Sequence, residues 1–399
     1  MLEIALKLLK KIEKSGFSAY IVGGFVRDYI MGRNSADVDI ATNATPKQLR
    51  EIFPNSSIAK EAYGSITVVL KKVRFEITTF RRELTYYNNR KPIEIEYIDD
   101  LLEDLKRRDF TINSMAYNEK EGLVDLFGGQ KDLDKKIIKT VGNPYDRFNE
   151  DGLRMVRAIR FSSKLDFDME EETLLAIYDN AKIIENISLE RITDEFTKII
   201  LSNKIENLIY LFKTKLLNYL NISEENDEEK INKLYEEIKI INKMEMDITK
   251  RLVVLDYFIE KLEIKCKSLC EELIYSKKII KDHNTILSTL KNIKMEELDK
   301  FAVKKILNEI GRDLFQKYLD ISEIIFKNAK NTVDILREIE ENNECYTIKN
   351  LKVNGNDIIS LGYENKEIGK VLDEILNEVM KNPSLNDRNY LMKRYKKSN

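Results

Sequence analysis

The sequence has few of the residues that bind transition metals or form crosslinks. Its 399 residues include no tryptophan, one histidine (His283) and three cysteines (Cys266, Cys270 and Cys345). Three cysteines cannot make a balanced disulfide framework, and Cys266 and Cys270 have no further ligands nearby that would complete a zinc site. One histidine also excludes a phosphohydrolase domain with a histidine-rich metal centre. Disulfide-stapled and zinc-dependent classes are therefore disfavoured.

Long apolar segments are missing as well. No run of 18 apolar residues is present, and the first residues do not form a cationic and apolar leader. We therefore expect a cytoplasmic protein without a membrane partner. The net charge of −2 does not by itself indicate RNA binding, because RNA-binding domains commonly have a pI above about 9. An RNA partner would have to meet local basic patches, for which the candidates are residues 81–82, 90–91, 106–108 and 393–397.

Glycine and proline are unevenly distributed. Ten of the 14 glycines fall at or before Gly152, and none lies between Gly152 and Gly311. Proline is absent between Pro144 and Pro383. Because these residues punctuate turns and interrupt helices, the distribution predicts an α+β fold. We expect a head with a mixed β-sheet and helices to about Val141, followed by an all-helical remainder.

A glycine pair marks a candidate phosphate-binding turn. Residues 18–22 are apolar and favour a strand, Gly23 and Gly24 interrupt it, and residues 25–31 can start a helix. Backbone N–H groups could approach phosphate oxygens here, because glycine has no Cβ and a helix N-terminus attracts anions. Arg27 could add a bidentate contact with phosphate. Glycine pairs also occur in ordinary turns, so the pair alone does not establish this site.

Two aspartates follow at a spacing typical of a metal site. Asp37 and Asp39 would point to the same side of a strand, while Val38 and Ile40 pack into the core. Two carboxylates held this close repel each other unless a cation lies between them. Mg²⁺ binds a few carboxylates together with substrate phosphates, so we expect it here. A solvated pair at a sheet edge is the alternative that the glycine turn makes less favourable.

A third carboxylate is available at Glu76. Residues 65–70 and 73–79 alternate between apolar and polar, and the dipeptide 71–72 between them predicts a hairpin. Phe75 and Ile77 would share one face, with Glu76 on the other. The Glu76 carboxylate could complete the metal site or accept the proton of an attacking hydroxyl. A surface glutamate fits the pattern equally well.

Asp151, Arg154, Arg157 and Arg160 recur at intervals of three, which predicts one stripe on a helix. A surface ion-pair ladder is one interpretation. The other is chemical, because a carboxylate accepts from the exocyclic amine of C or A while an arginine donates to the adjacent ring acceptor. U and G present a carbonyl oxygen at that position and would leave acceptors unpaired. Such a pair could admit CTP and ATP without a nucleic-acid template.

With these motifs in order, the sequence resembles the class II tRNA nucleotidyltransferases, the CCA-adding enzymes, which share a superfamily with bacterial poly(A) polymerases. The matching segments cover roughly the first half of the chain. They are residues 23–28 (GGFVRD), 37–42 (DVDIAT), 75–81 (FEITTFR), 107–113 (RRDFTIN), 125–130 (DLFGGQ), 150–161 (EDGLRMVRAIRF) and 187–192 (ISLERI).

The resemblance implies a role for each matching position. Asp37 and Asp39 would bind catalytic Mg²⁺, with Glu76 as a third carboxylate. Asp151 and Arg154 would read the base, and Glu150 would orient Arg154. The remaining nucleotide-binding residues would be Gly24, Arg27 and Arg108, with Asp109 and Asn113 near the sugar, and Arg157 and Arg160 supporting the base or triphosphate.

The resemblance also implies the domain order and the partners. We expect a catalytic head at residues 1–141, a helical neck at 142–205, a helical body at 206–335 and a helical tail at 336–399. The tail would bind tRNA, and the enzyme would use CTP and ATP to extend the 3′ end that the acceptor stem presents.

Several activities remain open within and beyond this family. Residues 82–92 form a full-length loop that resembles the flexible loop absent from enzymes that add only CC. Full CCA addition is therefore the leading hypothesis. A-only addition, poly(A) synthesis and a catalytically silent RNA-binding protein are the alternatives, and the intact Asp37, Asp39 and Arg154 argue against the last.

Overall fold

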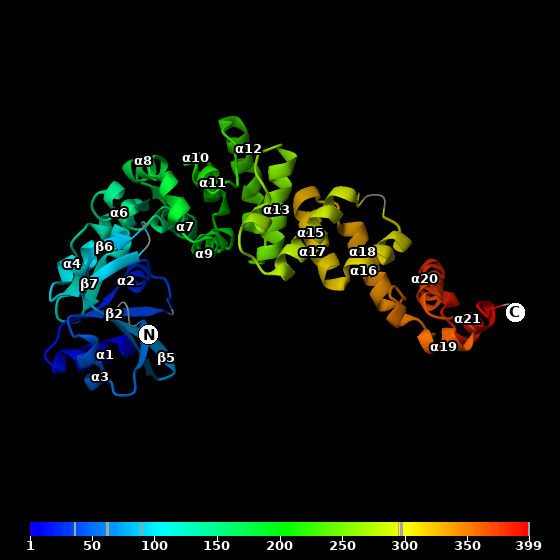
Figure 1. Ribbon diagram of the computed structural model, residues 1–399, viewed down its shortest axis with the longest axis horizontal. Coiled ribbons are helices and arrows are strands. Elements are labelled where there is room, and N and C mark those ends of the chain that lie inside the picture. The colour runs from blue at the N-terminus through cyan, green and yellow to red at the C-terminus, as the bar shows by residue number, and fades with distance from the viewer. Residues whose placement is uncertain are drawn as a thin grey trace. The chain divides into compact units, whose positions relative to one another are not determined.

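The description rests on a computed structural model that describes residues 1–35, 37–60, 64–87, 89, 91–293, 295 and 298–397 (Figure 1). The chain forms two compact units. One comprises Met1–Asn242 with Phe258–Ile274, and the other comprises Lys243–Tyr257 with Tyr275–Asn399. The first begins with a mixed sheet and its helices and continues as helices, whereas the second is helical in its described part. The expected α+β class is confirmed.

A seven-stranded mixed sheet forms the head, in the order β3-β4-β5-β2-β1-β8-β9. Strands β2 and β5 pair in parallel, and every other pairing in this sheet is antiparallel. The strands are β1 (Ala19–Val22), β2 (Val38–Thr42), β3 (Ser57–Lys60), β4 (Ser65–Leu70), β5 (Val73–Thr79), β8 (Met115–Asn118) and β9 (Gly122–Asp125).

Strand β5 alternates between buried apolar residues and more exposed polar residues, and this pattern explains how it packs in the sheet. Phe75 and Ile77 are fully buried, while Glu76 between them is partly exposed. The predicted turn at Lys71 and Lys72 is confirmed, because both residues adopt positive φ, as two-residue hairpin turns require. Helices of the head are α1 (Leu2–Lys14), α2 (Gly24–Ile30), α3 (Pro46–Ile52), α4 (Leu101–Lys106), η2 (Thr111–Asn113) and α5 (Gly129–Lys135).

A separate antiparallel pair, β6 (Arg81–Tyr87) and β7 (Lys91–Tyr97), spans the segment predicted as a loop. That part of the prediction is wrong for the described residues, because the two strands pair from Arg81↔Tyr97 to Tyr87↔Lys91, with irregularities in the register between Glu83 and Tyr86. A short parallel pair, β10 (Ile137–Ile138) and β11 (Asp168–Met169), links the end of the expected head to the helices that follow.

The helices that complete the first unit pack around apolar residues that face inward. In α7, Met155, Val156 and Ile159 are at most 1% exposed. These elements are α6 (Pro144–Glu150), α7 (Leu153–Leu165), α8 (Glu171–Asp179), η3 (Ala181–Asn186), α9 (Leu189–Ile200), η4 (Ile205–Leu208), α10 (Ile209–Lys213), α11 (Leu216–Tyr219), α12 (Glu228–Ile238) and α14 (Leu269–Glu272). Helix α13 (Ile248–Lys261) contributes residues to both units.

A buried lysine connects helices inside the second unit. Lys304 of α16 is fully buried, and its ammonium donates to the Met380 carbonyl at 2.9 Å and pairs with Glu344 at 2.5 Å. Its elements are α15 (Lys277–Asn292), α16 (Lys300–Ile310), α17 (Arg312–Phe326), α18 (Lys330–Glu341), η7 (Ile348–Asn350), α19 (Gly355–Ser360), α20 (Lys366–Lys381), η8 (Pro383–Leu385) and α21 (Arg388–Arg394), while η5 (Lys239–Lys243) ends where this unit starts.

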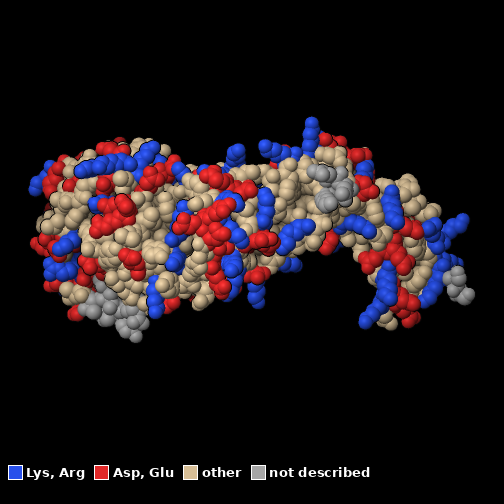
Figure 2. All heavy atoms as spheres, turned by 90° about the horizontal axis from the view of Figure 1, so that it is seen from above, with Lys and Arg blue, Asp and Glu red and all other residues tan. Residues whose placement is uncertain are grey.

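The apolar character of the helices and the distribution of surface charge bear on the partners of this protein. Among the described helices, none combines the length and apolar character that spanning a membrane requires. Acidic and basic side chains are interspersed over the face shown in Figure 2, in keeping with the net charge of −2.

Candidate active site

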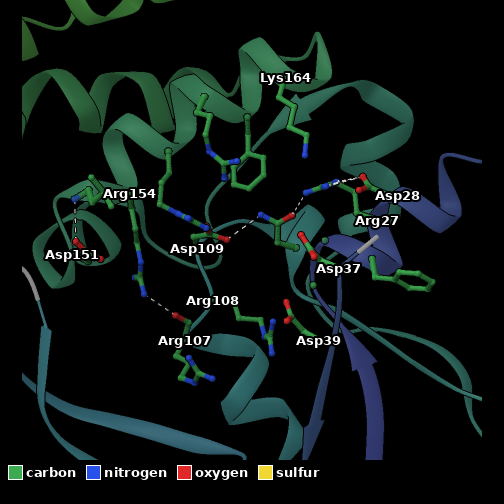
Figure 3. A pocket seen from close by; sticks show the side chains of 18 of the residues that line it. Arg27, Asp28, Asp37, Asp39, Arg107, Arg108, Asp109, Asp151, Arg154 and Lys164 are labelled. Atoms are coloured by element: carbon green, nitrogen blue, oxygen red, sulfur yellow. Dashed lines mark hydrogen bonds and ion pairs between the residues drawn. The ribbon is translucent and has the colours of Figure 1, made fainter. Parts of the chain in front are cut away.

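A polar cavity of about 610 Å³ lies in the first unit and gathers the predicted site residues (Figure 3). Strands and helices of the head supply one side of its lining, and helices α7 and α9 supply the other. All of the residues predicted to bind nucleotide or metal line this cavity, with the exception of Glu76, the predicted third carboxylate. They are Gly24, Arg27, Asp37, Asp39, Arg108, Asp109, Asn113, Asp151, Arg154, Arg157 and Arg160.

The glycine turn lies where β1 ends and α2 begins. Gly23 adopts φ +73°, which favours glycine, and a Cβ at this position would lie 3.3 Å from the Arg108 guanidinium. Arg27, one turn into α2, is 3% exposed. Its guanidinium donates to Asp28 Oδ1 at 2.8 Å and to Asn113 Oδ1 at 2.6 Å, so its orientation is fixed by the protein. The turn and Arg27 therefore present donors to one region of the cavity.

The aspartate pair lies beside this turn. Val38 and Ile40 of β2 are at most 2% exposed, and Asp39 between them is exposed on the opposite side, as the alternation predicts. Asp37 precedes β2 by one residue rather than lying in it. Figure 3 shows both carboxylates extending into the cavity. Two exposed carboxylates next to the N–H donors of the glycine turn and Arg27 suit Mg²⁺, which keeps water and substrate oxygens among its ligands.

Glu76 occupies a neighbouring cavity of about 450 Å³, which Asp39 and Arg108 also line. Within the described ranges, no three His, Cys, Asp or Glu side chains are grouped closely enough to form a metal cluster. Glu76 is therefore not part of a preformed three-carboxylate site. Its role as a third metal ligand stays a prediction.

Asp151 differs from the prediction in its local structure. It does not lie on a helix with the arginines, because it has extended backbone (φ −142°, ψ 105°) between α6 and α7. Its carboxylate accepts from the Leu153 N–H at 3.1 Å, and this capping bond keeps it at the start of α7. Both carboxylate oxygens also accept from the Arg191 guanidinium, at 3.3 and 2.8 Å.

Arg154 is held on three sides. It pairs with Glu150 at 2.5 Å, as predicted, and it donates to the carbonyl oxygens of Arg107 at 2.8 Å and Arg147 at 3.2 Å. Burial raises the pKa of Glu150, although the neighbouring guanidiniums of Arg154 and Arg147 oppose that shift. The result is a rigid guanidinium whose position depends on the segment that contains Arg107.

Asp109 joins the two sides of the cavity. It accepts from Arg157 Nε at 3.0 Å and from the Asn113 amide at 3.1 Å. Burial alone would raise its pKa, but the Arg157 guanidinium and these hydrogen bonds outweigh burial and lower the pKa to about 2. Asp109 is thus ionised at neutral pH and orients both Arg157 and Asn113.

Three positioning residues were not anticipated from the sequence: Asp104, Arg191 and Glu195. Asp104 is 1% exposed and accepts from Arg108 at 3.1 Å and from Arg107 at 2.6 Å. Glu195 of α9 pairs with Arg160 at 2.5 Å. Arg191 and Glu195 are four residues apart and therefore lie on one face of α9. This spacing was the one feature of the sequence that could have indicated that the two residues act together. The partners of Arg191 and Glu195 across the cavity, Asp151 and Arg160, lie 35 or more positions away in the sequence, so local spacing could not identify them, whereas Asp104 pairs with arginines only three and four residues further on.

The predicted basic patches are largely neutralised. Arg82 and Lys106 both pair with Glu103 at 3.3 Å, and Arg107 pairs with Asp104. In α21, Arg394 pairs with Glu378 at 2.7 Å. Arg90 and the side chain of Lys91 lie outside the described residues.

Two family models match parts of the chain that contribute to this cavity. The model described as "Poly A polymerase head domain" matches residues 19–139, and the one described as "Probable RNA and SrmB-binding site of polymerase A" matches residues 166–226. Together with a mixed sheet that carries a glycine turn and paired aspartates, these matches define a nucleotidyltransferase.

Individual relatives narrow the class. The CCA-adding enzyme of Ligilactobacillus salivarius is 35% identical over 98% of this chain and 96% of its own. That of Lactobacillus delbrueckii is 47% identical over 49% of this chain and 50% of its own. The Bacillus stearothermophilus CCA-adding enzyme, solved with CTP, has a TM-score of 0.79 and 27% identity, covering 98% of this chain and 96% of that one. The chain belongs to the class II CCA-adding enzymes, a family of tRNA nucleotidyltransferases.

Proposed function

We propose that this enzyme adds the 3′-terminal CCA to tRNA from CTP and ATP without a nucleic-acid template. The observation that carries the proposal is that one cavity contains both Asp37 and Asp39 and the Asp151–Arg154 pair. A reaction centre and a base-reading pair in one cavity are what a nucleotide-selecting transferase without a template requires. The names and ligand of the relatives support the same substrates.

Base selection would follow from the fixed donors and acceptors. The Arg154 guanidinium would donate to the ring acceptor of C or A, while Asp151 would accept from the exocyclic amine. Because Glu150 and two carbonyl oxygens hold Arg154, it cannot turn to suit U or G without losing those contacts. Asp151 can accept from a base while Arg191 holds it, since a carboxylate has about four acceptor sites.

The chemical step would take place beside Asp37 and Asp39. The tRNA 3′-hydroxyl would release its proton to water and its oxygen would form a bond to the α-phosphorus of the nucleotide, while the bond to the bridging oxygen breaks and pyrophosphate leaves with the electron pair. Mg²⁺ held by the two carboxylates would activate the attacking hydroxyl and neutralise charge on the phosphates. Arg27 and the N–H groups after Gly23 would hold the triphosphate in line. Asp109 and Asn113 would lie near the sugar.

The proposed division of the chain follows from this assignment. Residues 1–141 would form the catalytic head and 142–205 the neck that reads the base, while 206–335 and 336–399 would form the body and the tRNA-binding tail. We propose tRNA as the partner along these helices and the cytoplasm as the location.

The test uses purified protein, Mg²⁺ and three tRNA transcripts that end before CCA, after C and after CC. Each is offered CTP, ATP or both, and products are resolved at single-nucleotide length. Completion of all three to CCA and no further is the expected result. Extension of only the CC-ended transcript would establish A-only addition, and long A tails would establish poly(A) synthesis. Asp37→Ala should abolish addition and largely retain tRNA binding, whereas unchanged addition would contradict the metal assignment.

A further inference from the structure

Helix α7 carries a lysine at the far end of the cavity from the base-reading pair. Lys164 follows Arg160 by one turn and lines the same cavity as Arg154, Arg157 and Arg160. These four side chains share one face of α7, because their spacings are three or four residues. With a rise of about 1.5 Å per residue, Lys164 lies about 15 Å along the helix axis from Arg154.

The phosphate-binding turn lies at this same end. Figure 3 shows the Lys164 side chain descending from α7 toward Arg27. Desolvation lowers the pKa of the Lys164 ammonium, and the positive charge of Arg27 lowers it further, with Asp28 opposing. A lysine that is partly desolvated beside other cations is in an unfavourable environment until an anion arrives.

The carboxylates near Lys164 do not neutralise its ammonium group, so that group can bind such an anion. Asp28 pairs with Arg27 at 2.7 Å, and Glu195 pairs with Arg160 at 2.5 Å, so these two carboxylates are already engaged. Within the described part of the chain, no carboxylate lies within 4.0 Å of the Lys164 ammonium. Arg160 also stacks over Phe161, with its guanidinium carbon 3.9 Å from the ring centroid. This contact fixes the position of the Arg160 guanidinium on the face of α7 that it shares with Lys164.

We propose that Lys164 binds the terminal phosphate of the incoming nucleoside triphosphate, and hence the outer phosphate of the pyrophosphate product. The assignment rests on the function proposed above, since it takes the base to lie at Asp151 and Arg154 and the α-phosphate near Asp37 and Asp39. A triphosphate that continues past Arg27 reaches the end of α7, where Lys164 supplies a flexible point charge. Lys164 contributes to nucleotide affinity, and it does not read the base.

The experiment compares CTP, CDP and CMP, measured by calorimetry with Mg²⁺ and without tRNA, so that no transfer occurs. Lys164→Met is expected to weaken CTP binding about five- to tenfold, since it removes one partly exposed charge-assisted contact, and to leave CMP unchanged. Lys164→Arg keeps the charge and should remain within about twofold of the parent for all three. Lys7→Met, at an exposed lysine that lines neither cavity, is the matched control.

Steady-state addition provides the second measurement. Lys164→Met should raise KM for CTP and ATP by the same factor, leave kcat within about twofold, and keep the rejection of UTP and GTP. Unchanged CTP affinity overturns the assignment, and so does an equal loss for CTP and CMP. A rise in KM for tRNA alone would move the contact to the primer and also overturn it. Failure of the parent protein to bind CTP and ATP would instead contradict the proposed function. That outcome differs from every outcome described for the variants.

Discussion

Asp39 and Glu76 lie directly opposite each other on the adjacent parallel strands β2 and β5. Side chains at paired positions of neighbouring strands point to the same face of a sheet. The two carboxylates therefore share the face that also borders Arg108 in the neighbouring cavity. This pairing places Glu76 beside Asp39, which lines both cavities, even though Glu76 itself does not line the main cavity.

The first prediction concerns this pair. Glu76→Gln should lower kcat for CTP addition about 10- to 100-fold, because a carboxylate that orients or completes a metal site is lost. Raising the Mg²⁺ concentration should recover part of the activity. The measurement is kcat as a function of Mg²⁺, with the exposed Glu94→Gln of β7 as a control. A kcat equal to that of the parent at every Mg²⁺ concentration would leave Glu76 as a surface residue.

The head could be predicted well because its signals are local. The β4–β5 hairpin was evident from two alternating runs around Lys71 and Lys72, and the buried Val38 and Ile40 followed from the same period of two. The local structure of the site was harder to predict from the sequence. An interval of three suggested that Asp151 lies on a helix, but its own carboxylate caps the next helix, and aspartate favours that position over a helix interior.

Long-range pairs explain the rest of what the sequence missed. Arg191 pairs with Asp151 across 40 residues, and Glu195 pairs with Arg160 across 35. Of the residues predicted as a loop at 82–92, residues 82–87 and 91–92 lie in paired strands, because β-favouring residues such as Thr85 and Tyr87 gain partners on the opposite strand. Such pairings depend on tertiary folding, which local propensity does not report.

The second prediction tests how Asp151 is held. Arg191→Met should free the Asp151 carboxylate and reduce the preference for CTP and ATP over UTP by about tenfold in kcat/KM, because base selection needs an oriented acceptor. Misincorporation is measured with each nucleotide alone on the tRNA that ends before CCA. The exposed Arg50→Met of α3 is the matched control. Equal losses for cognate and non-cognate nucleotides would show that Arg191 stabilises the fold without acting on selection.

The third prediction concerns the end of the β6–β7 hairpin. Asn89 accepts from the Gly152 N–H through its carbonyl at 2.9 Å, and its amide donates to the Asn149 carbonyl at 2.5 Å. Its side-chain oxygen accepts from Asn186 at 3.0 Å. These bonds tie the hairpin to both sides of Asp151. Asn89→Gly tolerates the positive φ of 52° and deletes only the side-chain bonds, so it should lower kcat/KM about three- to tenfold.

A double-mutant cycle distinguishes loss of the Asn89–Asn186 hydrogen bond from general destabilisation of the protein. Asn186→Ala should have a smaller effect of the same kind, and the double variant should be no worse than Asn89→Gly alone, since both changes remove one shared contact. Kinetics are measured separately for C addition and for A addition. Strictly additive effects would mean that the two asparagines act independently and that the hairpin does not hold the turn through Asn186.

The last prediction uses pH. The folded pKa of Asp109 is lowered to about 2, below the usual value near 3.9, so its ionised form stabilises the fold above pH 4 and that contribution is lost as the pH falls toward 2. The difference corresponds to about 2 kcal/mol at neutral pH. Asp109→Asn should therefore unfold at lower urea than the parent at pH 7, and the gap should shrink at pH 3. Asp134→Asn, at an exposed position of α5, should show no gap at either pH. A gap of constant size would mean that Asp109 acts through packing, because only the ionic contribution depends on protonation.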